Sequence, residues 1–237
     1  MQYEFISRTL FFPSRGILVV GDLHIGYEAQ LRQSGILIPE RQIKDLITDL
    51  KKIFAEIEAK GYELRKIIFI GDIKHSFGFS REESREFDKV VEFLRDLLPP
   101  ENIIFIKGNH DTVDYSFERV MRDYYIESSA AFIHGHETFE EVWKPKIKTI
   151  VMGHIHPSVV LSEGVKNERY KCFLEGEYKK KKIIILPSFL DFVEGQVVNQ
   201  EGYEDYFSII PKRALMKFKV HIVGEDKVYG FGRMDKI

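Results

Sequence analysis

Seven of the eight histidines in this 237-residue chain lie in short polar segments that follow apolar runs. Aspartate and asparagine accompany them, and the segments occur in the order D-x-H at 22–24, G-D at 71–72, G-N-H-D at 108–111, H-G-H at 134–136 and G-H-I-H at 153–156. Carboxylate, amide and imidazole groups form a mixed oxygen and nitrogen ligand set, which suits manganese, iron or zinc better than magnesium or calcium alone. The pattern therefore indicates metal-assisted chemistry.

The spacing within two of these segments favours convergence of ligands. Residues i and i+2 of an extended segment project to the same side, so Asp22 with His24, and His154 with His156, can each direct two ligands at one point. So many ligands exceed the needs of one ion. Two ions about 3.5–4 Å apart that share a carboxylate are the arrangement used for in-line displacement at phosphorus. Asp72 is the expected bridge.

Each of these residues alone has an ordinary structural explanation. Asp22 and Asp72 follow apolar runs, where aspartate is common in turns, and Asn109 is equally ordinary after a glycine. It is the ordered set of five segments that favours a metal site. We expect His136 to have a supporting or structural part rather than to bind metal, and we assign His221, inside a strand pattern, to the fold or the surface.

Buried strands and helices must position these segments. The runs 17–20, 67–70 and 103–106 are β-branched or aromatic and end in glycine plus a polar residue, which is typical of strands covered on both faces. Helical periodicity predicts a helix over 39–60 that begins at Pro39, and another over 80–98 with capping-box spacing at its start. This alternation predicts a largely parallel sheet with the polar segments along one edge.

The second half of the sequence is richer in strand patterns. We expect strands within 130–135, 148–154, 169–175 and 181–187, and a hairpin from 216–223 to 227–232. A second sheet packed on the first accounts for them. A chain of 237 residues can form one large core, so we expect a single domain over 1–237.

The composition limits the classes of protein to which the chain can belong. A net charge of −2 with 30% charged residues is typical of a globular protein and gives no overall attraction to nucleic acid. Cys172 is the only cysteine, which excludes an intramolecular disulfide and favours a reducing, cytoplasmic setting. Neither a signal-peptide pattern nor an apolar run of membrane-spanning length occurs, so we expect no membrane association.

The ordered segments D-x-H, GD, GNHD, HGH and GHIH resemble those of the calcineurin-like metallophosphoesterases. Residues 22–39 and the LPSF at 186–189 resemble the SbcD-related archaeal phosphoesterases and the phosphoesterases associated with DNA ligase. The resemblance implies an α/β fold, a four-layer α/β/β/α sandwich of two mixed sheets flanked by helices. It also implies two divalent metal ions, for which we expect manganese, with iron, zinc, nickel and magnesium as alternatives.

The family pattern can be carried over residue by residue. It implies that one ion is bound by Asp22, His24, Asp72 and His156. It implies that the other is bound by Asp72, Asn109, His134 and His154. His110 resembles the catalytic histidine, with Asp111 as its orienting partner. The implied mechanism is in-line attack of a metal-bridging hydroxide on phosphorus.

The resemblance implies a phosphate ester substrate but leaves its class open. His75 stands where the DNA-repair nucleases of this superfamily have a histidine that assists catalysis, which favours a phosphodiesterase or nuclease-like enzyme, a nucleic acid or nucleotide partner and a DNA-repair partner. The short chain and the negative charge keep a phosphomonoesterase or nucleotide phosphatase as the alternative, and a non-catalytic scaffold with the same fold is a third.

Three basic features of the sequence lie outside the predicted metal site. The Lys179–Lys182 run could contact phosphates, but lysines at the start of a strand more often protect a sheet edge. Arg32 could meet a substrate phosphate or lie on a surface helix. Lys74, between Asp72 and His75, has no part assigned to it.

Overall fold

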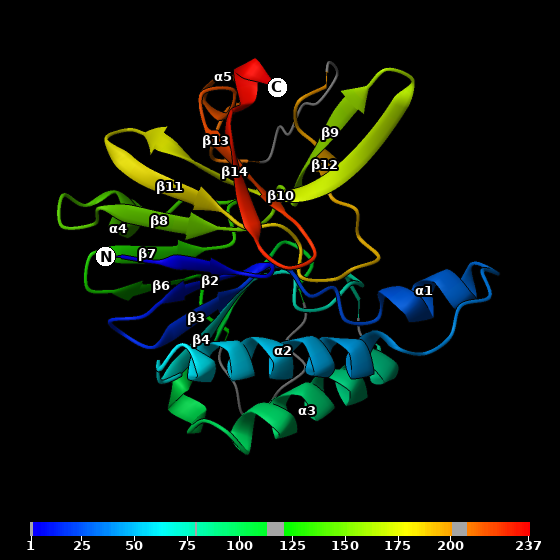
Figure 1. Ribbon diagram of the computed structural model, residues 1–237. Coiled ribbons are helices and arrows are strands. Elements are labelled where there is room, and N and C mark those ends of the chain that lie inside the picture. The colour runs from blue at the N-terminus through cyan, green and yellow to red at the C-terminus, as the bar shows by residue number, and fades with distance from the viewer. Residues whose placement is uncertain (1, 79, 113–120, 201–207) are drawn as a thin grey trace.

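The strands of this protein form two sheets that lie face to face, with helices on the outer side of each (Figure 1). The computed structural model describes residues 2–78, 80–112, 121–200 and 208–237. The predicted four-layer sandwich of two mixed sheets is confirmed.

The first sheet has the strand order β1-β2-β3-β4-β5. The strands β3, β4 and β5 are mutually parallel and correspond to the three predicted buried runs, whereas β1 and β2 add antiparallel partners at one edge. Their apolar residues are buried because helices cover one face of the sheet and the second sheet covers the other. The five strands are Glu4–Ile6, Thr9–Phe12, Ile17–Val20, Lys66–Ile70 and Ile103–Ile106.

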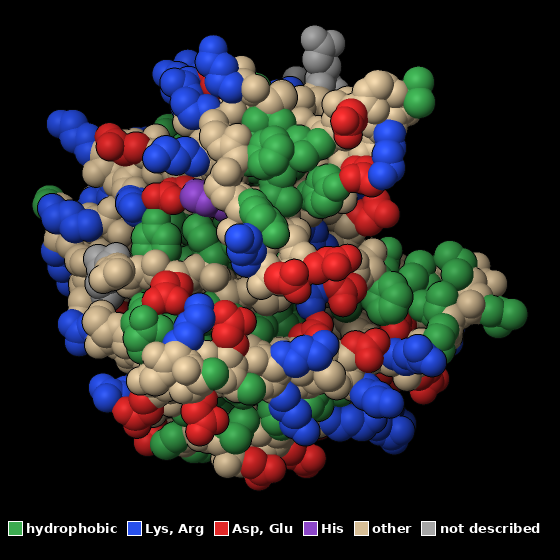
Figure 2. Space-filling view, viewed as in Figure 1, with side chains coloured by type: hydrophobic (Ala, Val, Ile, Leu, Met, Phe, Trp, Pro, Cys, Tyr) green, Lys and Arg blue, Asp and Glu red, His purple; other side chains and the backbone are tan. Residues whose placement is uncertain are grey.

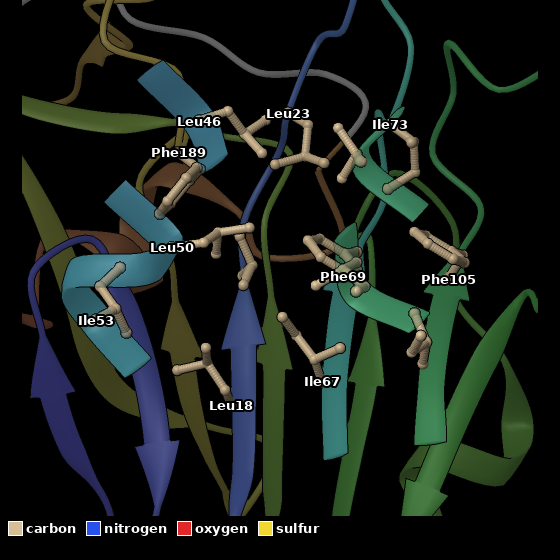
Figure 3. Packing of buried hydrophobic residues seen from close by; sticks show 14 of the residues in the cluster. Leu18, Leu23, Leu46, Leu50, Ile53, Ile67, Phe69, Ile73, Phe105 and Phe189 are labelled. Atoms are coloured by element: carbon tan, nitrogen blue, oxygen red, sulfur yellow. The ribbon is translucent and has the colours of Figure 1, made fainter. Parts of the chain in front are cut away.

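Two long helices, α2 (Gln42–Ala59) and α3 (Arg81–Arg95), lie side by side across the outer face of the first sheet (Figure 1). Apolar side chains on the inner side of α2, such as Leu50, pack against Leu18 and Phe69 of the sheet (Figure 3). This contact is the buried face that the helical periodicity predicts.

The start of α2 differs from the prediction. The helix begins at Gln42 rather than at Pro39. The carboxylate of Glu28, on the preceding helix α1 (Tyr27–Gln33), accepts hydrogen bonds from the backbone N–H groups of Arg41 and Gln42, both at 2.9 Å. Because a side chain from α1 satisfies these N–H groups, the start of α2 is set by a contact between helices and not by the proline.

The start of α3 follows the predicted cap. Ser80 Oγ accepts a hydrogen bond from the N–H of Glu83 at 3.3 Å. The Glu83 carboxylate accepts hydrogen bonds from the N–H and the hydroxyl of Ser76, at 3.0 and 2.5 Å. The first turn of α3 therefore also holds the loop that follows β4.

The second sheet has the order β12-β9-β10-β11-β8-β7-β6, with β13 paired to β10 and β14 to β13. The strands predicted in this part of the chain are confirmed. The short helices α4 (Glu140–Trp143) and α5 (Lys212–Leu215) lie outside this sheet, and the 3₁₀ turns η1 and η2 span Pro100–Asn102 and Met234–Lys236. The strands β6 to β14 are Tyr124–Glu127, Ala130–Ile133, Thr149–Met152, Pro157–Glu163, Lys166–Tyr178, Lys181–Ile185, Gln196–Val197, Lys219–Val223 and Val228–Arg233.

The core between the sheets fixes how their strand ends face one another. Phe12 from the first sheet meets Phe132 from the second edge to face, with ring centroids 6.0 Å apart. In the second sheet β7, β8 and β11 are parallel. The carboxyl ends of β3, β4 and β5 therefore come close to those of β7 and β8, as the backbone contacts below show.

Helix α1 and the segment after it project from the rest of the chain (Figure 1). Hydrophobic side chains gather on this projection (Figure 2), where Ile36 is 48% and Leu37 98% exposed. None of the helices in the described parts of the chain combines the length and apolarity that a membrane crossing requires.

Candidate metal centre

Backbone contacts join the loops that follow the parallel strands. The N–H groups of Leu23 and His24 both donate to the carbonyl of Asp72, at 3.1 and 2.8 Å, so the loops after β3 and β4 are held together. The N–H of His154, after β8, donates to Asp22 Oδ1 at 3.3 Å. This last bond joins the two sheets, and it places segments 132 residues apart in the sequence at one point.

Asp72 lies in the middle of this group and is 2% exposed. Its Oδ2 is 3.5 Å from His134 Nε2, 3.9 Å from His24 Nε2 and 3.9 Å from His110 Nε2. Its Oδ1 accepts a hydrogen bond from the N–H of His110 at 2.9 Å. A carboxylate oxygen that faces imidazoles from three different loops has the position that a bridging ligand needs.

Asp22 is fully buried and has an incompletely satisfied carboxylate. Its Oδ1 lies 3.2 Å from His134 Nδ1 and 3.2 Å from His156 Nε2, whereas Oδ2 has no hydrogen-bond partner among the residues that the structure describes. Burial alone would raise the pKa of Asp22, but the neighbouring His156 and His134 outweigh burial and hold this pKa well below its usual range. A buried, ionised oxygen without a partner fits a cation ligand.

His134 is held in one orientation by the backbone. Its Nδ1 is 3.0 Å from the carbonyl of Ile70, which can only accept, so Nδ1 carries a proton. Its Nε2 lies 3.0 Å from Asn109 Oδ1 and 3.2 Å from His154 Nδ1. An imidazole tied through one nitrogen to a carbonyl, with the other turned toward further ligand atoms, is typical of metal-binding histidines.

The carboxylates of the centre and its burial have opposite effects on the pKa values of the histidines. Burial would lower the pKa of His134, but the carboxylates of Asp72 and Asp22 outweigh it and raise this pKa to about 9. Burial, together with the charge of His156, holds the pKa of His24 well below its usual value. The two carboxylates are thus balanced by a protonated imidazole, and a divalent cation at this point would take the place of that proton.

Three sets of ligand atoms lie within 4.8 Å of one another, counting only the described residues. The first two sets share Asp72, as expected for two ions that use one carboxylate in common. The third contains both histidines for which catalytic parts are expected. The sets are His24 with Asp72 and His156, Asp22 with Asp72 and His134, and His24 with His75 and His110.

The backbone that carries these residues is not extended, contrary to the expectation for the D-x-H and H-x-H segments. His24, His154 and His156 have φ values of +45°, +68° and +47°, and Asp72 has +41°. These are left-handed conformations, which non-glycine residues adopt at a cost and which cluster at functional sites. The side chains converge because each loop turns sharply after its strand.

Two glycines permit the close packing of these loops. Gly71 has a φ of +102°, and a Cβ there would collide with the ring of His134. A Cβ on Gly108 would collide with the backbone and side chain of Asp72. The glycine that precedes each polar residue is therefore required by the approach of the next loop.

His110 is oriented by a backbone carbonyl. Its Nδ1 lies 2.6 Å from the carbonyl of His75, so Nδ1 donates and Nε2 is turned toward Asp72. The near-parallel ring of Phe77 packs on the His110 ring, with centroids 4.2 Å apart and an angle of 25° between the planes. These contacts fix the ring without a carboxylate.

Asp111, the expected orienting partner of His110, lies against backbone N–H groups of two loops. The Asp111 carboxylate accepts hydrogen bonds from the backbone N–H groups of Gly108 at 2.8 Å, and of Ile73 and Lys74, both at 3.2 Å. Burial raises the pKa of Asp111 in spite of these bonds. Asp111 connects the loops after β4 and β5, so its effect on His110 is indirect.

Lys74 closes the loop that carries His75. The Lys74 residue is 3% exposed, and its Nζ donates to the carbonyls of Ser76 at 3.0 Å and Gly78 at 3.3 Å. His75 Nδ1 lies 3.4 Å from His24 Nδ1. Burial, and then the nearby His110, lower the pKa of His75. The structure thus gives Lys74 a part that the sequence did not indicate.

Of the two other basic features, Arg32 lies on a helix, as one of its alternatives has it, whereas the lysine run does not protect a sheet edge, because β11 is paired with β10 and β8. Arg32 Nη2 pairs with Glu82 at 3.0 Å and Glu40 at 3.3 Å, on the helix α1. Lys181 Nζ donates to the carbonyls of Lys144 and Ile147, at 2.9 and 2.7 Å. The lysine run lies at the start of β11, and the carboxyl end of this strand pairs with that of β8, which leads to the centre. The run is therefore at the opposite end of the sheet.

The two remaining histidines differ in position. His136 packs beside His134, with centroids 5.2 Å apart, and burial lowers the pKa of His136 to about 4. His221 Nε2 is 3.0 Å from Glu175 Oε2 on a neighbouring strand, which agrees with its assignment to the fold.

One supporting residue was missed from the sequence. Gln42, the first residue of α2, donates from Nε2 to the carbonyls of His24 at 2.7 Å and Leu23 at 3.3 Å. Its Oε1 accepts from the N–H of Gly26 at 3.2 Å. No motif marks this glutamine, because its partners are backbone groups that any sequence would provide.

Comparisons with known proteins identify the family of this chain and proteins that share its fold. A family model described as "Calcineurin-like phosphoesterase" matches residues 16–168. The Pseudomonas putida nuclease MPE has a similar structure, with 19% sequence identity, a TM-score of 0.62, and coverage of 97% of this chain and 100% of that one. Comparison with curated protein sequences found no match.

Two further solved structures match with lower scores. One is a conserved uncharacterized protein, a predicted phosphoesterase from Streptococcus pneumoniae, with 14% identity, a TM-score of 0.38, and coverage of 98% of this chain and 99% of that one. The other is Vacuolar Protein Sorting 29 from Cryptosporidium parvum, with 14% identity, a TM-score of 0.40, and coverage of 92% and 97%.

Proposed function

The chain belongs to the calcineurin-like phosphoesterase family, and on this premise we propose that it is a metal-dependent hydrolase of phosphate esters that acts on phosphodiesters. The observation that carries the proposal is the carboxylate pair at the centre. Asp22 Oδ2 is buried without a partner among the described residues, and Asp72 Oδ2 faces three imidazoles. This donor set suits two divalent cations, with manganese as the first candidate.

We propose the two ligand sets that the family resemblance implies. We assign one ion to Asp22, His24, Asp72 and His156. We assign the other to Asp72, Asn109, His134 and His154. When bound, such ions lower the pKa of water and neutralise the charge that develops on the phosphate oxygens.

His110 is placed to protonate the leaving oxygen. Its Nδ1–H donates to the His75 carbonyl, which leaves Nε2 turned into the centre toward Asp72. A proton on Nε2 can then be transferred to the ester oxygen as the bond to phosphorus breaks. Because the ring is fixed by a carbonyl and by Phe77, little reorganisation is needed.

His75 supports the choice of a diester. Its ring lies next to both His24 and His110, with centroids 5.4 and 5.7 Å away, at the entrance to the centre. A diester carries a second esterified oxygen at phosphorus, and a second imidazole beside His110 can hydrogen-bond to it. The fold shared with a nuclease makes single-stranded DNA one of the diesters to test.

The direct test uses the purified protein with manganese. We expect faster turnover of bis-p-nitrophenyl phosphate than of p-nitrophenyl phosphate. Asp72→Ala should lose metal binding and turnover together, whereas His75→Ala should keep the metal and lose about 100-fold in diester turnover. His221→Ala, a histidine outside the centre, is the control.

Two results would contradict the proposal. If the monoester is hydrolysed well and neither the model diester nor single-stranded DNA is cleaved, the enzyme is a phosphomonoesterase. If elemental analysis finds no manganese on the protein after exposure to an excess, the interpretation as a scaffold replaces it.

A further inference from the structure

An open hollow of about 470 Å³ lies over the candidate metal centre. His24, His110 and His156 line it from the centre, Tyr27 lines it from the start of α1, and His75 lines it from the loop after β4. The rest of the wall is the segment 192–195, after the loop that follows β11. This segment therefore lies beside the candidate metal centre, where it can contact a bound substrate.

The hollow is poor in positive charge. No lysine or arginine lines it within the described ranges of the chain. Its carboxylate, Glu194, is paired with Arg169 Nη1 at 2.8 Å, and Arg169 also bonds the carbonyl of Gly195, so the arginine holds the wall rather than facing the hollow. A long polyanion is normally gripped by a track of cations along its backbone. The described residues of the hollow provide no such track of cations.

The hollow is instead rich in aromatic surface. Phe192 lines it and is 45% exposed, and Phe77 extends this surface from its position on the His110 ring while remaining 57% exposed. Tyr27 stands against His75 with ring centroids 4.8 Å apart. Large aromatic side chains are normally buried, and two half-exposed phenylalanines beside a catalytic centre suit a flat ring as ligand.

On the basis of the function proposed above, we propose that Phe192 and Phe77 bind a planar ring carried by the ester group that stays on phosphorus when the other ester group leaves. The ring is an aryl group or the base of a nucleotide in single-stranded form. The metal ions hold the phosphate and the phenylalanines select the group attached to it. A base paired in a duplex presents no free face, so duplex DNA is excluded as the preferred substrate.

The test compares diesters that share one leaving group. The manganese-loaded protein is given p-nitrophenyl esters of phosphate whose second ester group is ethyl, phenyl or thymidine 5′-yl. For the wild type and for Phe192→Ala, the ratio of kcat/KM for the ring-bearing ester to that for the ethyl ester is measured. The two esters differ in chemical reactivity by the same factor for both proteins. This factor therefore cancels when the ratio for the variant is compared with the ratio for the wild type.

We expect the ratio to fall about tenfold in Phe192→Ala, mainly through KM, because stacking on one aromatic side chain is lost. Phe192→Leu keeps an apolar side chain of similar bulk without the ring, so it should show most of the same loss even if the alanine variant folds poorly. Phe231→Ala, at a 48% exposed phenylalanine on β14, is the matched control and should keep the wild-type ratio. If the ratio falls for the thymidine ester alone, the surface binds nucleobases. If it falls for both the phenyl and the thymidine ester, the surface binds aromatic rings in general.

Three outcomes overturn this inference, and they separate it from the proposed function. If the ethyl ester is hydrolysed and the ratio is the same in the wild type and both Phe192 variants, the phosphoesterase assignment stands and the aromatic surface is not used. If none of the three diesters is hydrolysed, the proposed function itself fails and the inference with it. Cleavage of a duplex as fast as of its single strand would show that no free base is bound.

Discussion

At the scale of single residues, the candidate metal centre depends on side chains that fix the backbone of its loops. Asp111 binds three backbone N–H groups, and Lys74 binds two carbonyls of the loop that carries His75 and Phe77. Neither is placed to touch phosphorus. The loops after β4 and β5 therefore contain two kinds of residue, the proposed metal ligands and residues that fix the loops.

Lys74→Met tests this positioning part. Loss of the two bonds from Nζ should loosen the loop, so we expect diester turnover to fall about 10- to 100-fold, since small displacements of catalytic groups are costly. Manganese binding should persist, because Lys74 Nζ holds the carbonyls of Ser76 and Gly78, which follow the proposed ligand Asp72 in the loop. Lys52→Met, at an exposed lysine of α2, is the control. Unchanged turnover in Lys74→Met would show that the loop is held without its lysine.

At the scale of elements, the start of α2 supports the first ligand loop. The amide of Gln42 bonds the carbonyls of Leu23 and His24 and the N–H of Gly26, while Glu28 on α1 caps the same helix end. A helix that packs on the sheet through its apolar face thus also fixes the loop after β3, which carries the proposed ligands Asp22 and His24.

Gln42→Ala should therefore affect stability and metal affinity together. Three backbone groups lose their partner in a buried setting, so we expect the free energy of unfolding to fall by about 2–3 kcal/mol. We also expect weaker manganese binding, measured by titration calorimetry, because the backbone of His24 is released. Gln30→Ala, at an exposed glutamine of α1, should change neither quantity. If affinity is retained while stability falls, the loop is positioned by its other contacts.

A second contact between elements makes the stability of the folded protein depend on pH. Glu175 on β10 accepts hydrogen bonds from His221 on β13 and Lys182 on β11, both at 3.0 Å. The hydrogen bond from His221 is the main reason that the pKa of Glu175 lies well below its usual 4.5. This carboxylate is ionised in the folded protein and protonates first in the unfolded chain, so its contribution is present above pH 4.5 and is lost as the pH falls below that value.

Glu175→Gln should lower the free energy of unfolding by about 1 kcal/mol at pH 7. The difference from the wild type should shrink as the pH is lowered from 5 to 2, which denaturant titrations at several pH values would measure. Glu177→Gln, at an exposed position of the same strand, is the control. A difference that stays constant with pH would mean that the charge of Glu175 has no part in it.

At the scale of the whole molecule, the centre joins the two sheets, so its ligands should couple metal binding to global stability. Manganese at about 100 times its dissociation constant adds about 2.7 kcal/mol to a protein that binds it only when folded. For a chain of this length that corresponds to a rise in Tm of roughly 5–10 °C. Asp22→Asn should show little or no rise in a thermal melt, and an equal rise in that variant would place the ion elsewhere.

The strands were the most predictable part of this structure. The runs that became β3, β4 and β5 are continuous and apolar, so burial on both faces could be inferred directly, and each was followed by its polar segment. The start of α2 could not be inferred, because it depends on Glu28 from another helix. Five strands were not predicted, because their sequences carry too little pattern and their pairing depends on neighbouring strands. They are β1, β2, β6, β9 and β12.

The candidate site was predictable as a set but not in its geometry. Residue types and order predicted that seven proposed ligands lie at one edge of the sheet, and the structure places their loops together. The spacing argument assumed extended backbone, whereas the loops turn through left-handed conformations. The contacts of Asp111, Lys74 and Gln42 involve backbone groups of other loops, and such contacts leave no trace in side-chain patterns.

Those left-handed conformations also bear on how such a protein can change over generations. Four proposed ligands, His24, Asp72, His154 and His156, hold a backbone shape that costs about 1–3 kcal/mol each for residues other than glycine. Glycine would relieve this cost at all four positions. Selection for activity and selection for stability therefore act in opposite directions on these residues. A descendant released from catalysis would be expected to replace them first, and to become more stable as it did so.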